Sequence, residues 1–361
     1  MGNFINSAPF ALVIVFLIIG FVLLIKGADF FVEGSSSVAK RLHVPSIIIG
    51  LTIVAMGTSL PETAVSVSAS ITGNNELAVS NVVGSNIFNL MVVIGVCAMI
   101  ATVNVAKETI KRDIPFSLIC AGLLLILGIL GVGDKSGMML GHFDGVIFIG
   151  AFAGYIFYMI KIALKASKEG KKVEIEGGSD EDIKLISVPL SILFIIGGAA
   201  AIAIGGDITV DAASRIASDL GMSQTLIGLT IVSIGTSLPE LVTSVTAARK
   251  GNAGIAIGNI VGSNIFNTLM IVGCTALFAP IVITQNTLKK EIPLCILSSI
   301  VLLICANDVL LDHAAQNVLS ITDGLLLLCF FAIFLGYTFA IASNGKSEGA
   351  DEEIRQLPIW R

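Results

Sequence analysis

An internal repeat constrains this chain more than any other feature of its sequence. A shift of 178 positions aligns residues 50–90 with residues 228–268, and 25 of the 41 aligned pairs are identical without a gap. Both copies contain the hexapeptide GTSLPE, at 57–62 and at 235–240. A match this long at one fixed shift predicts that the chain folds as two halves with similar helices.

Both copies lie in apolar sequence. Of the 361 residues, 55% are hydrophobic and 13% are charged, whereas about a quarter of the residues in a soluble domain are charged. A helix that crosses a bilayer needs ~20 mainly apolar residues. We therefore predict an all-α polytopic membrane protein with about ten transmembrane helices, one for each uncharged stretch. These stretches are 9–25, 44–61, 77–106, 114–133, 145–160, 185–206, 220–239, 251–288, 292–307 and 324–344.

The repeat divides the chain into two transmembrane halves of about five helices each. We place the first half at 1–164 and the second at 185–343, joined by a hydrophilic cytoplasmic linker over 165–184 that is too short for a folded domain. Residues 344–361 are expected to form a disordered tail. An odd number of spans in each repeat forces the second copy to enter the membrane in the opposite direction, which predicts two inverted five-helix repeats.

The distribution of basic residues favours an inverted repeat. Lys and Arg concentrate in the cytoplasmic loops of membrane proteins, so equivalent loops of inverted halves should differ in basic content. Lys40 and Arg41 correspond to Ser218 and Asp219, whereas Ile71 and Thr72 correspond to Arg249 and Lys250. We predict that the N-terminus and the C-terminus both lie outside, although the lysines of KKEIP at 289–293 then fall on the wrong side.

Each hexapeptide predicts a broken helix. Proline lacks an N–H group and clashes with the carbonyl four residues earlier, so Pro61 and Pro239 each disturb a membrane helix close to a glycine, Gly57 or Gly235. Irregular backbone at membrane depth is tolerated only where protein buries it or where it lines a wet cavity. A cation would satisfy the carbonyl oxygens that the break releases.

A glutamate follows each proline. Glu62 and Glu240 begin the second parts of the broken helices, where an unpaired carboxylate costs at least a few kcal/mol. A two-fold axis in the membrane plane would bring them together, and their repulsion would recruit a proton or a cation. Carboxylate, carbonyl and hydroxyl oxygens suit Ca²⁺ or Na⁺ better than a soft transition metal. Helix caps or interface contacts are expected instead for Asp29, Glu33, Asp207 and Asp211.

The second element of each repeat carries a polar stripe. Asn81, Ser85 and Asn89 are four residues apart and share one helix face, as do Asn259, Ser263 and Asn267. Small residues such as Gly84 and Gly262 would let this helix approach the broken one closely. Taken alone, a kink with one acid is equally explained as a structural bend, and the polar stripe as contacts between helices. Because both halves repeat the same glutamate and the same stripe, we predict an ion site.

The segments GLTIVAMGTSLPE…NVVGSNIFN and GLTIVSIGTSLPE…NIVGSNIFN resemble the paired repeats of the calcium/cation antiporter superfamily, especially short prokaryotic members of its sodium/calcium exchanger branch. The resemblance covers nearly the whole chain and implies antiport of Ca²⁺ against Na⁺ by alternating access at a site near the membrane midplane. It assigns Ca²⁺ to Glu62 and Glu240 with the carbonyls of Thr58 and Thr236. It assigns Na⁺ to Ser59, Ser85, Ser237 and Ser263 with the carbonyls of Ala55 and Ser233, and the centre of the cluster to Asn89 and Asn267.

The chain departs from the family pattern at one pair of positions. Many relatives carry an aspartate at the position of Asn89 or Asn267, but both are amides here, which argues against co-transport of K⁺. The linker has no room for the large cytosolic regulatory domain of animal exchangers. We expect Ca²⁺ and Na⁺ as substrates and a lipid bilayer, that of a prokaryotic plasma membrane, around the protein. No cofactor, nucleic-acid partner or obligatory protein partner is expected.

The nearest alternative function is a Ca²⁺/H⁺ antiporter that uses the same glutamates as proton carriers. The abundant hydroxyls and carbonyls favour Na⁺, because a proton needs only the carboxylates. An intramembrane hydrolase, the alternative from among the enzymes, is disfavoured because the sequence offers no credible Ser/His or paired-Asp arrangement at membrane depth. Paired acids at proline breaks also suit an occluded site better than the open pore of a channel. We therefore expect a transporter rather than an enzyme.

Overall fold

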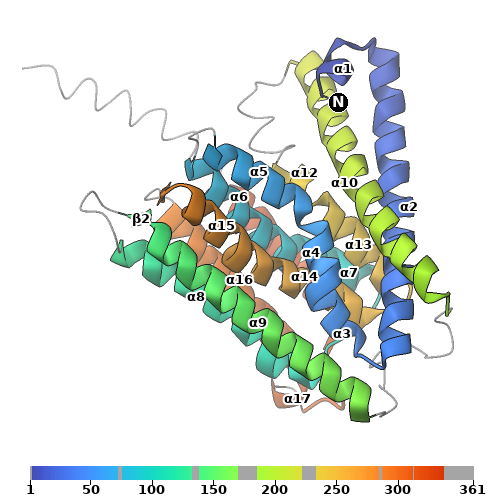
Figure 1. The fold of residues 1–361 in the computed structure, drawn as a ribbon, viewed down its shortest axis with the longest axis vertical. Coiled ribbons are helices and arrows are strands. Elements are labelled where there is room, and N and C mark those ends of the chain that lie inside the picture. The colour runs from blue at the N-terminus through green and yellow to red at the C-terminus, as the bar shows by residue number, and fades with distance from the viewer. Residues whose placement is uncertain are drawn as a thin grey trace, which may run out of the picture.

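A computed structural model of the protein describes residues 2–71, 75–131, 138–169, 185–221, 233–283, 287–311 and 313–336. Most of these residues are helical (Figure 1). Six of the described helices are long and apolar enough to cross a membrane, and a bent pair, Ser46–Thr58 with Leu60–Val67, would make a seventh span. The predicted all-α membrane class is confirmed. The count of ten spans stays a prediction, because part of the stretch 220–239 lies outside the described residues.

The first half begins with α1 and a long helix, followed by a broken helix and the helix that carries the polar stripe. The label η marks a π-helical turn. The described elements are α1 (Gly2–Ser7), α2 (Phe10–Leu42), α3 (Ser46–Ile49), η1 (Gly50–Val54), α4 (Ala55–Thr58), α5 (Leu60–Ile71), α6 (Asn75–Phe88), η2 (Asn89–Val93), α7 (Ile94–Ile100), β1 (Val103–Asn104), η3 (Thr109–Asp113), α8 (Ile114–Leu130), β2 (Met139–Leu140) and α9 (His142–Glu169).

The described elements of the second half follow a similar order, although α1, α3 and η1 have no described counterpart there. They are α10 (Val188–Asp219), α12 (Ser233–Thr236), α13 (Leu238–Arg249), α14 (Ala253–Phe266), η6 (Asn267–Ile271), α15 (Val272–Phe278), β3 (Ile281–Val282), η7 (Thr287–Glu291), α16 (Ile292–Cys305), α17 (Asp308–Leu311), β4 (Val318–Leu319) and a last helix over Ile321–Gly336. Helix α17 has no described counterpart in the first half. Most of the predicted linker and the whole predicted tail lie outside the described residues.

Local sequence explains where several helices begin and end. Helix α2 starts directly after Pro9 and ends at Leu42, because the next residue, His43, adopts a left-handed conformation with φ of 51°. Helix α8 ends in the same way at Gly131, where a glycine accepts the left-handed backbone without strain. Asp144 accepts the Gly141 N–H at 2.8 Å and so satisfies a free donor at the start of α9. Each boundary follows from residues within a few positions of it.

The two stripe helices occupy the centre of the bundle. In the most apolar 18-residue part of each long helix, 83% of the residues are buried for Ala253–Phe278 and 72% for Val79–Ile100. The corresponding share is 22% for α2 and α10 and 17% for α9. The outer helices therefore expose apolar side chains, as a lipid environment requires, and the polar stripes are kept away from lipid.

Two short sheets tie the halves together. Strand β1 pairs antiparallel with β4, and β2 pairs antiparallel with β3. Strand β1 precedes α8 and β4 follows α16, so the start of α8 lies near the end of α16. Strand β2 follows α8 and β3 precedes α16, so the end of α8 lies near the start of α16. Helices α8 and α16, which are equivalent in the repeat, accordingly run in opposite directions. An inverted repeat would place these two helices in this way, and the inversion of the whole halves stays a prediction.

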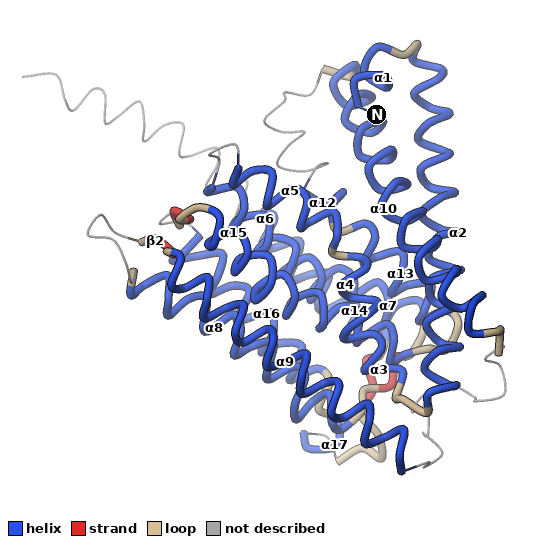
Figure 2. The backbone as a smooth tube through the Cα atoms, viewed as in Figure 1, coloured by secondary structure: helices blue, strands red, loops and turns tan. Residues whose placement is uncertain are grey.

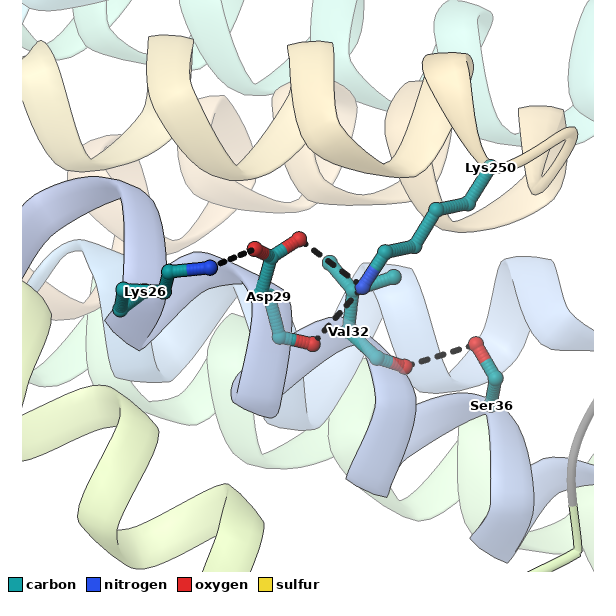
Figure 3. Close-up of polar contacts among 5 residues, drawn as sticks. All are labelled: Lys26, Asp29, Val32, Ser36 and Lys250. Carbon is teal, nitrogen blue, oxygen red and sulfur yellow. Dashed lines mark hydrogen bonds and ion pairs between the residues drawn. The ribbon is translucent and has the colours of Figure 1, made fainter.

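Helices α2 and α10 lie side by side and pack against the rest of the bundle (Figure 2). Their contact is a close approach of backbones, since a Cβ built on Gly27 would lie 2.9 Å from the Ile202 N and one built on Gly198 would lie 2.7 Å from the Phe31 N. An ion pair joins α2 to the end of α13, where Lys250 Nζ lies 3.0 Å from Asp29 Oδ1 (Figure 3). Asp29 makes the interface contact expected of it, although it lies within α2 rather than near its end.

The stripe helix α14 crosses the broken helix of the other half at a contact without room for a side chain. A Cβ on Gly262 would lie 2.7 Å from both the Cα and the carbonyl oxygen of Leu51 in η1. The expected close approach is therefore present at Gly262, whereas a Cβ on Gly84 would meet no described atom within 4 Å. The contact at Gly262 joins the two halves to each other.

Gly262→Ala is expected to lower the thermal unfolding temperature in detergent by several degrees, because overpacking of a tight contact costs ~1–3 kcal/mol. Gly154→Ala is the matched control, since a Cβ on Gly154 in α9 meets no described atom within 4 Å. The control should unfold at the temperature of the wild type. Equal unfolding temperatures for both variants would show that α14 and η1 are less tightly packed than described.

Candidate ion-binding site

Both hexapeptides break their helices at the serine before the Leu-Pro pair. Ser59, with φ of −83° and ψ of 13°, separates α4 from α5, and Ser237, with φ of −93° and ψ of 4°, separates α12 from α13. The two parts of the first broken helix are bent by 45°. Because the prolines cannot continue the helical hydrogen bonds, Glu62 and Glu240 lie in the first turn of the helix that follows.

The two glutamates are fully buried and are linked through serines. The exposed fraction of Glu62 and of Glu240 is 0%. Ser59 Oγ donates to Glu240 Oε1 at 2.8 Å, and Ser237 Oγ donates to Glu62 Oε1 at 3.4 Å. Since each break serine binds the glutamate of the other half, the two hexapeptides face each other. The repeat brings both carboxylates to one place, as the predicted two-fold axis requires.

The stripe serines complete the same arrangement. Ser85 Oγ donates to Glu62 Oε1 at 3.5 Å, and Ser263 Oγ donates to Glu240 Oε1 at 3.4 Å. Ser85 Oγ also lies 2.9 Å from Ser237 Oγ. Each glutamate therefore binds one serine from its own half and one from the other, which holds one oxygen of each carboxylate in a fixed orientation.

Four buried oxygens of this cluster have no hydrogen-bond partner among the described residues. They are Glu62 Oε2, Glu240 Oε2, Asn89 Oδ1 and Asn267 Oδ1. A buried acceptor without a partner costs ~1–3 kcal/mol, and more when it is charged. All four can only accept when the carboxylates are ionised, and each half contributes the same two. A cation is the ligand that satisfies such a set.

The remaining predicted ligands lie on the broken helices. Thr58 is buried, and its Oγ1 donates to Asn259 Oδ1 at 3.0 Å and approaches the Ala55 carbonyl at 3.3 Å. That carbonyl also lies 3.5 Å from Ser263 Oγ. Thr236 is buried one residue before the second break, and Ser233 begins α12, although its side chain is outside the described part. Direct ligation by these four carbonyls stays a prediction.

The outermost stripe residues act as contacts between helices. Asn81 Nδ2 donates to Ser66 Oγ at 3.3 Å, and Asn259 Nδ2 donates to Ser244 Oγ at 2.9 Å. These equivalent bonds hold each stripe helix to the second part of the broken helix of its own half. The interpretation of stripe residues as contacts is correct for this pair. In contrast, Ser85 and Ser263 bond to the glutamates, and Asn267 bonds to Ser85. Asn89 is the repeat equivalent of Asn267, and its side chain bonds to Asn264.

Sequence reasoning missed Asn86 and Asn264, which bond to the cluster amides. The repeat does contain a signal for them, because both halves have asparagine directly after the stripe serine. They are off the stripe by one residue, so helical spacing did not select them. The π-helical turns that begin at Asn89 and at Asn267 were also missed. Such turns are frequent at functional sites but have no reliable sequence signal.

Comparison with known proteins places this geometry in a family. The family model described as sodium/calcium exchanger protein matches residues 12–161 and 190–340, one segment in each half. The chain belongs to the sodium/calcium exchanger family. It is therefore an integral membrane transporter of the exchanger type, as the resemblance of the two repeats implied.

Individual known proteins are similar to this chain over nearly its whole length. The putative antiporter CaxA of Alkalimonas amylolytica is 36% identical over 330 residues, which cover 91% of this chain and 98% of CaxA. The sodium/calcium exchanger MaX1 of Methanosarcina acetivorans is 32% identical over 358 residues, which cover 90% of this chain and 98% of MaX1. A structure of the sodium-calcium exchanger NCX_Mj, soaked with Na⁺ and Sr²⁺, superposes with a TM-score of 0.74 at 28% identity, covering 91% of this chain and 99% of that one.

Proposed function

We propose that this protein exchanges Ca²⁺ for Na⁺ by alternating access at the cluster formed by Glu62, Glu240, Asn89 and Asn267. The observation that carries the proposal is the set of four unpartnered, buried acceptor oxygens, two from each half. Two ionised carboxylates balance the charge of one Ca²⁺ or of two Na⁺. Either occupant removes the cost of buried, uncompensated charge, and the two compete because they need the same oxygens.

The amide oxygens favour Na⁺ over H⁺ as the coupling ion. A proton binds to a carboxylate but not, at ordinary pH, to the amide oxygen of Asn89 or Asn267. A Ca²⁺/H⁺ antiporter would therefore leave both amide acceptors unsatisfied whenever it carried protons. Na⁺ is bound by oxygen ligands and satisfies carboxylate, amide and hydroxyl oxygens together. The relatives MaX1 and NCX_Mj, both described as sodium/calcium exchangers, support this choice.

Ion fluxes in proteoliposomes test the proposal. Uptake of ⁴⁵Ca²⁺ should follow an outward Na⁺ gradient at equal pH on both sides, and should not follow a pH gradient in the absence of Na⁺. Addition of K⁺ to the Na⁺-driven reaction should leave the rate of uptake unchanged, because the described site lacks the third carboxylate that the family resemblance links to co-transport of K⁺. Uptake driven by a pH gradient without Na⁺ would instead establish the Ca²⁺/H⁺ alternative.

The orientation that we propose places both termini outside a prokaryotic plasma membrane. Helices α5 and α13 are equivalent in the repeat and end at Ile71 and Arg249. An inverted repeat puts these two ends on opposite sides of the membrane. In a background without the six native cysteines, Ile71→Cys should react with an impermeant thiol reagent from outside and Arg249→Cys only from the cytoplasm. Labelling of both from the same side would contradict the inversion.

A further inference from the structure

We propose that Asn86 and Asn264 are positioning residues that fix which atom of the Asn89 and Asn267 amides faces the ions. This inference rests on the proposed function. All four residues are buried, with exposed fractions between 0% and 3%. Asn86 and Asn264 belong to the central helices α6 and α14, and they form crossed hydrogen bonds between the two halves. Among the described residues, their side-chain hydrogen bonds go to Asn89, Asn267, Thr268 and each other's backbone rather than to a glutamate. They therefore act on the ions through other residues.

Backbone carbonyls fix the orientation of the two positioning residues. Asn264 Nδ2 donates to the carbonyl oxygen of Asn86 at 3.2 Å, and Asn86 Nδ2 approaches the carbonyl oxygen of Asn264 at 3.5 Å. A carbonyl oxygen can only accept, so the nitrogen of each side-chain amide has to face it. Asn86 Nδ2 also donates to Thr268 Oγ1 at 2.9 Å. The side-chain oxygens of Asn86 and Asn264 therefore point away from these carbonyls.

The fixed oxygens in turn orient the amides of the ion cluster. Asn89 Nδ2 donates to Asn264 Oδ1 at 3.1 Å, and Asn267 Nδ2 donates to Asn86 Oδ1 at 3.2 Å. A flipped amide of Asn89 or Asn267 would bring two acceptor oxygens together, which is unfavourable. Both cluster amides therefore hold their nitrogen toward the positioning residue. Their own oxygens, which have no partner among the described residues, remain available to a cation.

The crossed pattern gives the proposal a specific signature. The side chain of Asn264 bonds to Asn89 of the other half, and that of Asn86 bonds to Asn267 of the other half. Asn264 meets Asn267 through the backbone, where its carbonyl accepts the Asn267 N–H, and alanine at 264 keeps that bond. Removal of Asn264 should affect ion binding through Asn89. A residue that merely supported the packing of α6 against α14 would affect both cluster amides alike.

A double-mutant cycle on Ca²⁺ binding tests this signature. We expect Asn264→Ala to raise the Ca²⁺ concentration for half-saturation of the purified protein about tenfold, the size of one lost hydrogen bond near an ion. In an Asn89→Ala background, Asn264→Ala should not raise this concentration further. In an Asn267→Ala background, the increases caused by Asn264→Ala and by Asn267→Ala should multiply. For Asn86→Ala the backgrounds exchange roles: no further increase is expected with Asn267→Ala, and multiplied increases are expected with Asn89→Ala. Equilibrium binding of ⁴⁵Ca²⁺ measures all these variants without requiring transport.

Controls separate this inference from the proposed function. Asn317→Ala removes a buried asparagine whose Oδ1 accepts the Val309 N–H at 2.9 Å, far from the cluster in sequence. It should leave Ca²⁺ binding unchanged. If the alanine variants do not fold, Asn264→Gln and Asn86→Gln retain an amide but displace it, and should give the same pattern. Increases that multiply in both backgrounds, or unchanged binding by Asn264→Ala, would overturn the positioning role. Normal Ca²⁺ binding by Glu240→Gln would instead overturn the proposed function.

Discussion

Glu62→Gln and Glu240→Gln are each expected to abolish Ca²⁺ exchange. Both side chains are fully buried, and each leaves one carboxylate oxygen without a partner among the described residues. One neutral amide would leave half the charge of a bound Ca²⁺ uncompensated beside fully buried side chains. Glutamine also turns a donor toward the cluster in place of an acceptor. Uptake of ⁴⁵Ca²⁺ into proteoliposomes driven by a Na⁺ gradient measures the loss.

The equivalence of the two glutamates is part of this expectation. Each glutamate accepts from one serine of its own half and one of the other. The two glutamine variants should therefore lose similar amounts of exchange activity. Asp207→Asn is a suitable control, because Asp207 is an exposed carboxylate within α10 and outside the cluster. It should retain exchange. Near-normal flux in either glutamine variant would mean that the cluster is not the transport site.

Asn267→Asp is expected to extend proton inhibition of exchange to higher pH. Asn267 Nδ2 donates to Ser85 Oγ at 3.3 Å and to Asn86 Oδ1 at 3.2 Å. An aspartate loses both donors and places a third negative charge beside two existing ones. Repulsion between the three favours the protonated form, which competes with cations. Falling pH should thus inhibit the variant before it inhibits the wild type, and K⁺ could gain an effect on flux.

Initial rates of ⁴⁵Ca²⁺ uptake over a series of equal internal and external pH values measure the change. Asn267→Ala serves as the comparison, since it removes the amide without adding charge. It should weaken exchange without abolishing it and should keep the pH profile of the wild type. An unchanged profile in Asn267→Asp, with both glutamine variants inactive, would show that residue 267 does not face the ions.

Local chemistry in the sequence determined the class of the protein and the position of its candidate site. Apolar stretches leave bilayer-spanning helices as the main option, because a lipid-exposed backbone has to satisfy its own hydrogen bonds. Pro61 and Pro239 indicated broken helices for the same kind of local reason, and the structure breaks them at Ser59 and Ser237. An acid after each proline then identified Glu62 as a candidate ligand, together with its repeat equivalent. The identical hexapeptide in both copies, at one fixed shift, indicated that both glutamates belong to one site.

Only the tertiary structure decided which residues meet across the halves. Ser59 binds Glu240, Thr58 binds Asn259, and Asn86 binds Asn267, all between segments that are far apart in sequence. No local pattern encodes such pairs, because they depend on how the two broken helices cross the two stripe helices. The glycine contact between Gly262 and Leu51 sets that crossing, and π-helical turns at Asn89 and Asn267 change the helix register there. The stripe itself followed from helical spacing, whereas the direction in which each amide points depends on hydrogen bonds formed only when the halves are packed together.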